Sequence, residues 1–366
     1  MAPHRVLHVR ITAGTGGGPE KTIVNSPRFL AGTGYEAEAA VLHPPGDPGF
    51  GVLAERAREA GCPLTGIGER GPISPRALGR LASLCRERGI TIWHGHDYKS
   101  NLYGVLLRRR LGLHLVTTVH GWVRHTWKTP LYHAVDRWCL RRHGQVVCVS
   151  RDLFESCTEL GVAPERLHLI ENAIDTERFT RRASARASGR LRIGAVGRLS
   201  EEKGFALLIE AVERLVAEGL DLELTIAGEG HLRDELTRRI AATAEPERFR
   251  MAGFCEDTRA LFEGFDLFCL SSLREGLPNV VLEAMAMEVC VLATRSGGME
   301  AFARDGVDAL LVDPGSADEL AEGIARLAGD PALRAALARA ARERVCREVD
   351  FGGRMERMVE VYERLD

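Results

Sequence analysis

Residues 267–286 read LFCLSSLREGLPNVVLEAMA, a short apolar run followed by a polar loop and a second apolar run. The first run has the length of a buried strand. Gly276 permits a tight turn in the loop, and Pro278 suits the first turn of a helix. We interpret the residues from 280 to 287 as that helix. A buried strand that leads directly into a helix is the repeating unit of a parallel sheet with crossover connections.

The same alternation of short apolar runs with amphipathic segments extends along the whole chain, and it predicts an α/β fold. The strands expected in the first half cover residues 5–11, 37–43, 91–94, 115–120, 145–149 and 167–171. Those expected in the second half cover residues 191–196, 222–227, 249–252, 267–270, 289–293 and 309–312. No tandem repeat is present, so we predict two doubly wound, Rossmann-like domains.

A length of 366 residues also favours two domains, because one domain takes about 100–200 residues. Residues 180–190 are polar, small and aperiodic, which is typical of a linker. We therefore expect an N-terminal domain over 1–175, a linker over 176–190 and a C-terminal domain over 191–345. The chain should be wholly helical from residue 317 onward, with a final helix over 346–366.

The composition excludes several classes of protein. With 45% hydrophobic and 27% charged residues, the chain is neither disordered nor collagen-like. A net charge of −2 argues against nucleic acid as a partner. The chain shows no signal-peptide core and no uncharged apolar run of about 18 residues. Its nine cysteines contain no C-x-x-C pair, so we expect a reduced, cytoplasmic protein.

A glycine-rich turn, TGGGPEK at residues 15–21, follows the first expected strand. Backbone N–H groups in such a turn, those of Gly16 and Gly17 among them, can bind an anion at a helix start. The spacing is not a dinucleotide fingerprint, because Pro19 stands where a glycine is required. It is not a P-loop either, because no Gly-Lys-Ser/Thr follows. An anion site and a simple tight turn are both compatible with this sequence.

A second loop, VGRLSEEKG at residues 196–204, follows the first strand of the second domain. It places Arg198 at the strand end and Lys203 at the start of the next helix. Two cations at the carboxyl edge of a parallel sheet can hold a diphosphate, which is how we interpret them. The alternative is a solvated Lys–Glu pair at a helix start.

Two carboxylates belong to the stretch quoted first. Glu283 lies in an otherwise apolar helix, where an unpaired charge is costly. We therefore expect it to accept hydrogen bonds from a ligand diol such as a ribose. Glu275, in the loop, can do the same for a sugar hydroxyl. A helix-capping carboxylate is the alternative.

The first half contains all four tryptophans and every histidine except His231. Indole faces and imidazoles suit a polyhydroxylated acceptor, although core packing is an equally simple explanation. His94 and His96 lie on one face of a strand, where they either line an acceptor site or bind a metal. We favour the acceptor site. Because no Asp-x-Asp sequence is present, we expect no metal and no other cofactor.

Basic clusters at residues 108–110 and 141–142 end two expected helices of the first domain. Such clusters can contact anionic lipid headgroups, which would place the protein at the inner face of the cell membrane. The alternative is a solvated helix face, since arginine is favoured near helix C-termini. Peripheral membrane contact is therefore one possible interaction of this chain.

Together these motifs resemble the retaining glycosyltransferases of the GT-B fold, specifically glycosyltransferase family 4. The segment from Glu275 to Glu283 is similar to the E-x7-E motif of that family. Other matching segments follow in the family's order, namely 16–17, 118–121, 149–150, 172–175, 197–199 with Lys203, 227–230, 253–254 and 297–300. The chain departs from the family pattern at 173–174, where Gly-Val is frequent, and at Met299, where proline is frequent. Neither position is an expected charged contact.

The resemblance implies a nucleotide-sugar site in the second domain. Arg198 and Lys203 would stabilise the departing diphosphate, helped by the amides of Gly16 and Gly17, and Glu283 would hold the ribose. The transferred sugar and its phosphate would be positioned by Glu275, Gly276, Leu277, Pro278 and Asn279. His120 would lie beside the sugar, as a base or as a group that orients it; the catalytic residues would be His120, Arg198, Lys203 and Glu275.

The resemblance also implies two domains that face each other across a cleft, with the final helix crossing back to the first. The first domain would bind the acceptor through Glu20, His94, His96, Tyr98, Lys99 and Trp122. The expected reaction transfers a hexose-type sugar, with retention, from a UDP- or GDP-sugar. The acceptor would be a hydroxyl of a glycan, a lipid-linked saccharide or a secondary metabolite.

Three alternatives fit the same sequence. A sugar-nucleotide epimerase of the GT-B fold would need no acceptor. A two-lobed protein that closes on a saccharide without chemistry is expected to be exported, and the missing signal sequence argues against it. A non-catalytic partner subunit would not need the complete charged set.

Overall fold

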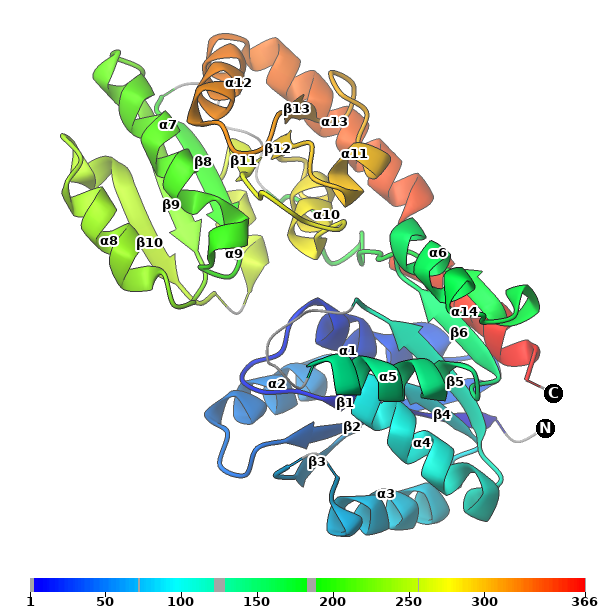
Figure 1. The fold of residues 1–366 in the computed structure, drawn as a ribbon. Coiled ribbons are helices and arrows are strands. Elements are labelled where there is room, and N and C mark those ends of the chain that lie inside the picture. Colours follow the sequence, from blue (N-terminus) through cyan, green and yellow to red (C-terminus); the bar gives the residue numbers. More distant parts are fainter. Residues whose placement is uncertain (1–2, 72, 122–128, 183–188, 256, 366) are drawn as a thin grey trace. The chain divides into compact units, whose positions relative to one another are not determined.

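The computed structural model describes residues 3–71, 73–121, 129–182, 189–255 and 257–365 (Figure 1). Strands and helices alternate along this part of the chain, and the strands of both sheets pair in parallel. The chain divides into two compact units, one made of Met1–Glu171 with Gly352–Asp366 and the other of Asn172–Phe351. The predicted α/β class with two doubly wound sheets is confirmed.

The first unit is built on a sheet that has seven strands within the described residues, in the order β3-β2-β1-β4-β5-β6-β7. Its strands are β1 (His4–Ile11), β2 (Tyr35–His43), β3 (Leu64–Gly68), β4 (Ile92–Gly95), β5 (His114–Val119), β6 (Gln145–Cys148) and β7 (Leu167–Leu169). Its helices are α1 (Gly18–Leu30), α2 (Pro48–Glu59), α3 (Pro75–Arg88), α4 (Tyr98–Leu111), α5 (Thr129–Leu140), α6 (Arg151–Glu159) and α14 (Phe351–Glu363).

The second unit has six strands among its described residues, in the order β10-β9-β8-β11-β12-β13. They are β8 (Leu191–Val196), β9 (Leu222–Ala227), β10 (Phe249–Gly253), β11 (Leu267–Leu270), β12 (Cys290–Thr294) and β13 (Leu310–Val312). The helices are α7 (Phe205–Ala217), α8 (Arg233–Ala241), α9 (Thr258–Glu263), α10 (Asn279–Ala286), α11 (Gly298–Phe302), α12 (Ala317–Gly329) and α13 (Pro331–Glu348).

Burial on both faces explains the apolar character of the central strands. Every residue of β11 and of β12 is buried. Helices cover both faces of such a parallel sheet, so its strands read as continuous apolar runs and show no alternation. No helix in the described part of the chain is both long and apolar enough to cross a membrane.

Both sheets reverse their strand order at their first strand. β1 lies between β2 and β4, and β8 lies between β9 and β11. In open parallel sheets, ligands bind outside the carboxyl ends of the strands at such a reversal. The loops that follow β1 and β4, and those that follow β8 and β11, are therefore the places where a site is expected.

One strand was not predicted. β3 pairs only with β2 at the edge of the first sheet, and its sequence LTGIG holds just two large apolar residues. An edge strand buries less side-chain surface than a central one, so it leaves a weaker hydrophobic signal. The other strands lie within a few residues of the expected positions.

The structure moves both expected domain boundaries. Residues 172–182 pack with the second unit, where Ile174 and Phe179 belong to its hydrophobic core. The Arg181 guanidinium also donates to the carbonyls of Phe265 and Glu288, at 3.1 and 3.3 Å. This segment therefore neither ends the first domain at 175 nor begins a free linker at 176. Residues 183–188 of the expected linker lie outside the described residues.

The C-terminal boundary also differs from the expected position of 346. α13 continues to Glu348 within the second unit, and the chain returns to the first unit at Gly352. There the side chain of Gln145 donates to the carbonyl of Arg364 at 3.1 Å. The last helix therefore belongs to the first unit, in agreement with the return implied by the resemblance.

Candidate functional site

The loop after β8 carries two of the expected cations. Arg198 stands two residues beyond the strand, and its exposed side chain forms no ion pair with any described residue. Lys203 ends a single 3-10 turn, and Gly204 follows with a φ of 65°. A Cβ atom at Gly204 would lie 2.1 Å from the Ser271 carbonyl oxygen. Glycine is therefore required where this loop touches the loop after β11.

Hydrogen bonds tie the loops after β8 and β11 together. The Ser271 hydroxyl donates to the Lys203 carbonyl at 2.8 Å, and the Leu273 N–H donates to the Glu202 carbonyl at 2.8 Å. On the other side, the hydroxyl of Thr294 from β12 donates to the carbonyl of buried Ser272. The loop after β11 is thus held by the loop after β8 on one side and by the end of β12 on the other.

Lys203 and Glu275 meet across this junction. The ammonium of Lys203 forms an ion pair with Oε2 of Glu275, and the two side chains are only 16% and 20% exposed. The Ser272 hydroxyl lies 3.4 Å from the same carboxylate oxygen. The structure therefore brings two of the expected catalytic residues into contact at the carboxyl edge of the sheet, in the loops that follow the paired strands β8 and β11.

The stretch that follows Glu275 begins α10 as predicted. The helix begins at Asn279, directly after Pro278, and the residues from Gly276 to Asn279 are half-buried or exposed. Glu283, in contrast, is completely buried and accepts a hydrogen bond from the Thr258 hydroxyl of α9 at 2.7 Å. A ribose contact by Glu283 therefore requires an opening around this side chain.

The start of α11 fixes the backbone of Glu275. The Gly298 N–H donates to the Glu275 carbonyl at 3.1 Å. A Cβ atom on Gly298 would lie 2.3 Å from the carbonyl carbon of Gly276. Because no side chain fits there, the Gly-Gly pair of the 297–300 motif lets α11 approach the loop closely.

The glycine-rich turn of the first unit is filled by its own glutamate. Buried Glu20 accepts hydrogen bonds from the Thr12 hydroxyl and the Gly17 N–H, both at 2.7 Å, and pairs with Arg10. Burial acts to raise the pKa of Glu20, but Arg10 and these two hydrogen bonds lower it below its usual value. Gly16 turns the chain with a φ of 73°.

Two expectations change as a result. The Gly17 N–H, expected to contact a diphosphate, is occupied by Glu20. The carboxylate of Glu20, expected to contact an acceptor, is buried under the same turn. In the structure Glu20 takes the place that we assigned to an external anion, because its side chain reaches the N-terminus of its own helix.

Four histidines from three adjacent strands gather in the first unit, with Tyr362 of α14 beside them. His8 comes from β1, His94 and His96 from the end of β4, and His120 from the end of β5. Parallel register places His8 directly opposite His94. Burial lowers the pKa of all four imidazoles, that of His8 to about 3.

His94 is not an acceptor contact in this structure. Its Nδ1 lies 2.8 Å from the Tyr362 hydroxyl and its Nε2 lies 2.8 Å from the Thr118 hydroxyl, and the side chain is buried. His96 is also buried, with its Nδ1 3.0 Å from Nε2 of His120. Sequence reasoning missed the partners His8 and Tyr362, which only the register of β1 with β4 and the return of the chain at α14 bring here.

A metal is the other candidate for this cluster. Ring nitrogens of His8, His94 and His96 lie within 4.8 Å of one another. However, both nitrogens of His94 and of His96 already lie within hydrogen-bonding distance of protein groups. A metal would have to displace several of these contacts, so the expected absence of a metal stays our prediction.

Lys99 differs most from its expected role. Its ammonium is buried, with only 2% of the side chain exposed, and lies 2.7 Å from Oε1 of Glu69, whose side chain is equally buried. Lys99 therefore forms a buried ion pair with Glu69, and its ammonium is not available for the acceptor contact that we expected. Tyr98, the first residue of α4, is half-buried, and Trp122 lies outside the described residues.

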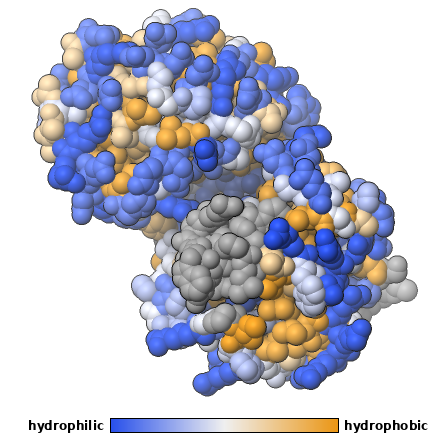
Figure 2. Space-filling model, viewed as in Figure 1, coloured by the Kyte–Doolittle hydropathy of each residue, from blue (hydrophilic) through white to orange (hydrophobic). Residues whose placement is uncertain are grey.

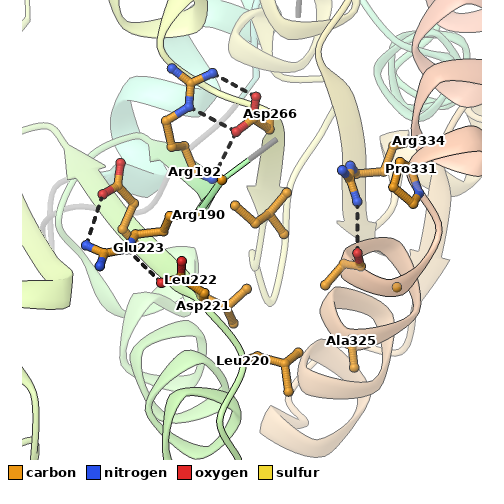
Figure 3. Close-up of a pocket in the computed structure, with 14 residues that line it drawn as sticks. Arg190, Arg192, Leu220, Asp221, Leu222, Glu223, Asp266, Ala325, Pro331 and Arg334 are labelled. Carbon is orange, nitrogen blue, oxygen red and sulfur yellow. Dashed lines mark hydrogen bonds and ion pairs between the residues drawn. The ribbon is translucent and has the colours of Figure 1, made fainter. Parts of the chain in front are cut away.

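A pocket of about 700 Å³ lies in the second unit, lined by the first residues of β8 and β9 and the end of α12 (Figure 3). Its charged groups are already paired, because Arg190 contacts Asp221 and Arg192 contacts Asp266. Arg334 donates to the end of α12. This pocket lies at the amino ends of the strands, whereas the Lys203–Glu275 pair lies at their carboxyl ends.

Comparisons with known proteins identify the family of this chain. Residues 16–178 match the family model for Glycosyltransferase Family 4, and residues 176–344 match the model for Glycosyl transferases group 1. The alpha-D-kanosaminyltransferase of Streptomyces kanamyceticus is 30% identical over 280 residues, which are 70% of this chain and 72% of that protein. The chain belongs to glycosyltransferase family 4. The family suggested by the E-x7-E motif is therefore confirmed.

Other family-4 relatives share shorter regions with the chain. The lipopolysaccharide core biosynthesis glycosyltransferase LpsE of Rhizobium meliloti is 35% identical over 201 residues, 53% of this chain and 56% of that protein. The 2-deoxystreptamine glucosyltransferase of Streptomyces kanamyceticus is 30% identical over 227 residues, 58% of this chain and 59% of that protein. The chain thus spans less than two thirds of the length of these two relatives.

Solved structures show that this family-4 chain has the GT-B fold. Anabaena Alr3699/HepE, solved in complex with UDP-glucose, gives a TM-score of 0.81 at 20% identity and covers 98% of this chain and 99% of its own. The sucrose-phosphate synthase of Thermosynechococcus elongatus gives a TM-score of 0.77 at 20% identity, with 99% of both chains covered. The predicted GT-B fold is confirmed.

Proposed function

We propose that the protein is a retaining, metal-independent glycosyltransferase that moves a hexose-type sugar from a UDP- or GDP-sugar to a hydroxyl group. The acceptor is a glycan, a lipid-linked saccharide or a secondary metabolite. The observation that supports this proposal most is the Lys203–Glu275 ion pair at the carboxyl edge of the second sheet. Relatives named as glucosyl-, galactosyl- and kanosaminyltransferases support the hexose donor.

The two cations in the loop after β8 supply the electrostatics that this reaction needs. As a nucleoside diphosphate leaves a sugar, negative charge grows on the departing oxygen and positive charge grows on the ring. Lys203 and Arg198 would stabilise that oxygen, and fixed charges of this kind are among the strongest contributions to catalysis. In retaining transfer the bond from the anomeric carbon to phosphate breaks while the bond to the acceptor oxygen forms on the same face. The acceptor proton passes to the departing phosphate.

Glu275 links binding to chemistry in this proposal. Without an anion, its carboxylate neutralises Lys203. A diphosphate at this edge would compete for the ammonium and leave the carboxylate free to accept a hydrogen bond from a hydroxyl of the transferred sugar. The residues from Gly276 to Asn279 would contribute backbone groups at the start of α10, and Glu283 would bind the ribose once its surroundings open.

The proposed acceptors follow the chemistry named for the relatives. LpsE is named for lipopolysaccharide core biosynthesis, a Campylobacter jejuni relative acts on a diphospho-undecaprenol saccharide, and another relative glycosylates 2-deoxystreptamine. These names cover the three acceptor classes of our proposal. We assign the acceptor to the first unit, where half-buried His120 and Tyr98 lie near the carboxyl ends of β5 and β4.

The proposal predicts that UDP or GDP raises the melting temperature, whereas ADP and dTDP do so less. A ligand at 100 times its Kd stabilises the native state by about 2.7 kcal/mol.

With the matching sugar nucleotide and an acceptor, product NMR should show the anomeric configuration of the donor sugar, and EDTA should leave the rate unchanged. Conversion of the sugar nucleotide without an acceptor would indicate an epimerase, and binding without conversion would indicate a binding protein. Either result would contradict the proposal.

We also propose that the first unit contacts the inner face of the cytoplasmic membrane. Leu106 of α4 and Trp138 of α5 are large apolar side chains that are 47% and 44% exposed. The Arg142 guanidinium stacks over the Trp138 ring at 3.7 Å, and Arg109 and Arg110 are exposed on the same helix as Leu106. Figure 2 shows apolar surface beside hydrophilic surface on the face of this unit that carries α4. Apolar groups beside arginines suit an anionic bilayer surface.

Sedimentation with vesicles tests this contact. The protein should bind vesicles that contain phosphatidylglycerol and not vesicles of phosphatidylcholine alone. Arg109→Glu with Arg110→Glu should weaken binding by about 30-fold or more, because each basic side chain near the surface contributes about 1 kcal/mol. The matched control reverses Arg238 and Arg326 in the second unit, which are also exposed. Equal binding by the two double variants would exclude α4 as the contact.

A further inference from the structure

Three imidazoles of the first unit form a line from its interior to its surface, which we call the histidine line (His8, His96 and His120). Nδ1 of His8 lies 2.9 Å from Nε2 of His96, and Nδ1 of His96 lies 3.0 Å from Nε2 of His120. His8 and His96 are buried, whereas His120 is half-buried. Nδ1 of His120 has no hydrogen-bond partner within the described part of the chain.

The hydrogen bonds along this line must all be donated in the same direction, either from His8 toward His120 or from His120 toward His8. Burial holds the pKa of each ring below neutrality, so each ring is neutral and carries a single N–H. His96 therefore donates through one nitrogen and accepts through the other. If it accepts from His8, it donates to His120; if it donates to His8, it accepts from His120. The tautomer of His8 thus sets the tautomer of His120.

The buried end of the line selects the direction. Nε2 of His8 is buried and has no hydrogen-bond partner among the described atoms. If the protons pointed inward, this nitrogen would carry a buried N–H with no acceptor. If they point outward, it carries only a lone pair. Unpaired buried N–H groups are the rarer and costlier case, so the outward direction is favoured.

Cations act on both ends of the line and so do not select a direction by themselves. The buried guanidinium of Arg354 in α14 acts electrostatically on His8, and its Nε–H also lacks an acceptor among the described atoms. Arg354 acts on His120 as well, and Arg10 acts on both His96 and His120. No described carboxylate pairs with His8, so its unpartnered Nε2 is the feature that selects the outward direction.

We propose that His8 and His96 are positioning residues that fix His120 as its Nδ1–H tautomer, so that His120 presents a hydrogen-bond donor and not a lone pair. The role of His120 toward a substrate rests on the proposed transferase function, in which it would donate a hydrogen bond to an oxygen of the transferred sugar or of its phosphate. It would not serve as the base that deprotonates the acceptor. His94 stands outside the line, because Tyr362 and Thr118 occupy both of its nitrogens.

Nitrogen-15 NMR of histidine-labelled protein tests the proposal without any substrate. Two-bond proton–nitrogen correlations separate the Nδ1–H tautomer, the Nε2–H tautomer and the imidazolium. We expect His8, His96 and His120 all as Nδ1–H at pH 7. The three rings as Nε2–H, or His120 as an imidazolium, would overturn the proposal. So would loss of the three N–H signals on titration with Zn²⁺, because that result would assign a metal site.

Two variants of His8 then test the coupling. His8→Asp replaces the N–H beside His96 with a carboxylate oxygen that can only accept, so His96 should donate to it and His120 should become Nε2–H. His8→Asn can supply an amide N–H close to the position of Nδ1, and it should keep His120 as Nδ1–H. His143→Leu is the matched control, since His143 is buried but contacts the Cys139 carbonyl and not the line. A His120 spectrum that is unchanged in His8→Asp would refute the coupling, whatever the enzyme activity.

Discussion

Lys203→Ala is expected to lower kcat/KM for sugar transfer by about 100- to 1,000-fold, the range measured for loss of one group that stabilises a developing oxyanion. Lys203 carries one of the two cations in the loop after β8, and its ammonium already meets the carboxylate that we assign to the transferred sugar. Its removal weakens nucleotide-sugar binding and leaves the departing diphosphate to Arg198 alone. Initial rates at several donor concentrations, with Lys203→Arg as the charge-conserving variant, measure the effect. Lys203→Arg should recover part of the lost activity.

The control for this experiment is Arg214→Ala, on the helix that follows the same loop. Arg214 forms ion pairs with Glu218 and Asp318, and all three side chains are exposed. Exposed pairs contribute roughly 0–1 kcal/mol, so this variant should keep its activity and melting temperature. A folded Lys203→Ala variant with wild-type turnover would show that Lys203 does not stabilise the leaving group, and the proposed mechanism would fail.

The loop after β11 could be predicted from the sequence because its information is local. An apolar run, Gly276, Pro278 and an apolar helix follow one another within 20 residues. Each of these features acts through short-range physics: burial of a strand, freedom of a turn, and the fixed φ of proline at a helix start. The contact between Lys203 and Glu275 then follows from the rule that ligand sites form where strand order reverses.

The first unit was harder to predict because its contacts are not local. His8 meets His94 only through the register of two parallel strands, and Tyr362 reaches them from the far end of the chain. Lys99 illustrates the same limit. The sequence pattern of a lysine at a helix start is that of an exposed side chain. Lys99 can be buried only because Glu69, which lies before α3, compensates its charge. The sequence pattern alone does not show which charges compensate one another.

Lys99→Met should destabilise the first unit by about 3–5 kcal/mol, the usual cost of leaving one partner of a buried ion pair without the other. Glu69 would keep a hydrogen bond from the Tyr103 hydroxyl at 2.6 Å. It would lose the ammonium at 2.7 Å, and the Gly71 carbonyl would lose its donor. Methionine has a similar length, so the loss would come from charge and not from a cavity. Urea unfolding followed by circular dichroism measures the change in free energy.

Two further variants separate the ion pair from the general effect of substitution in α4. Arg110→Met, on the exposed side of the same helix, should change the free energy of unfolding by no more than about 0.5 kcal/mol. Adding Glu69→Gln to Lys99→Met removes the uncompensated charge while leaving an amide that can still bond to Tyr103, so it should restore part of the lost stability. If Lys99→Met were as stable as Arg110→Met, the ammonium would be free to leave its buried position. The expectation that Lys99 contacts the acceptor would then have to be reconsidered.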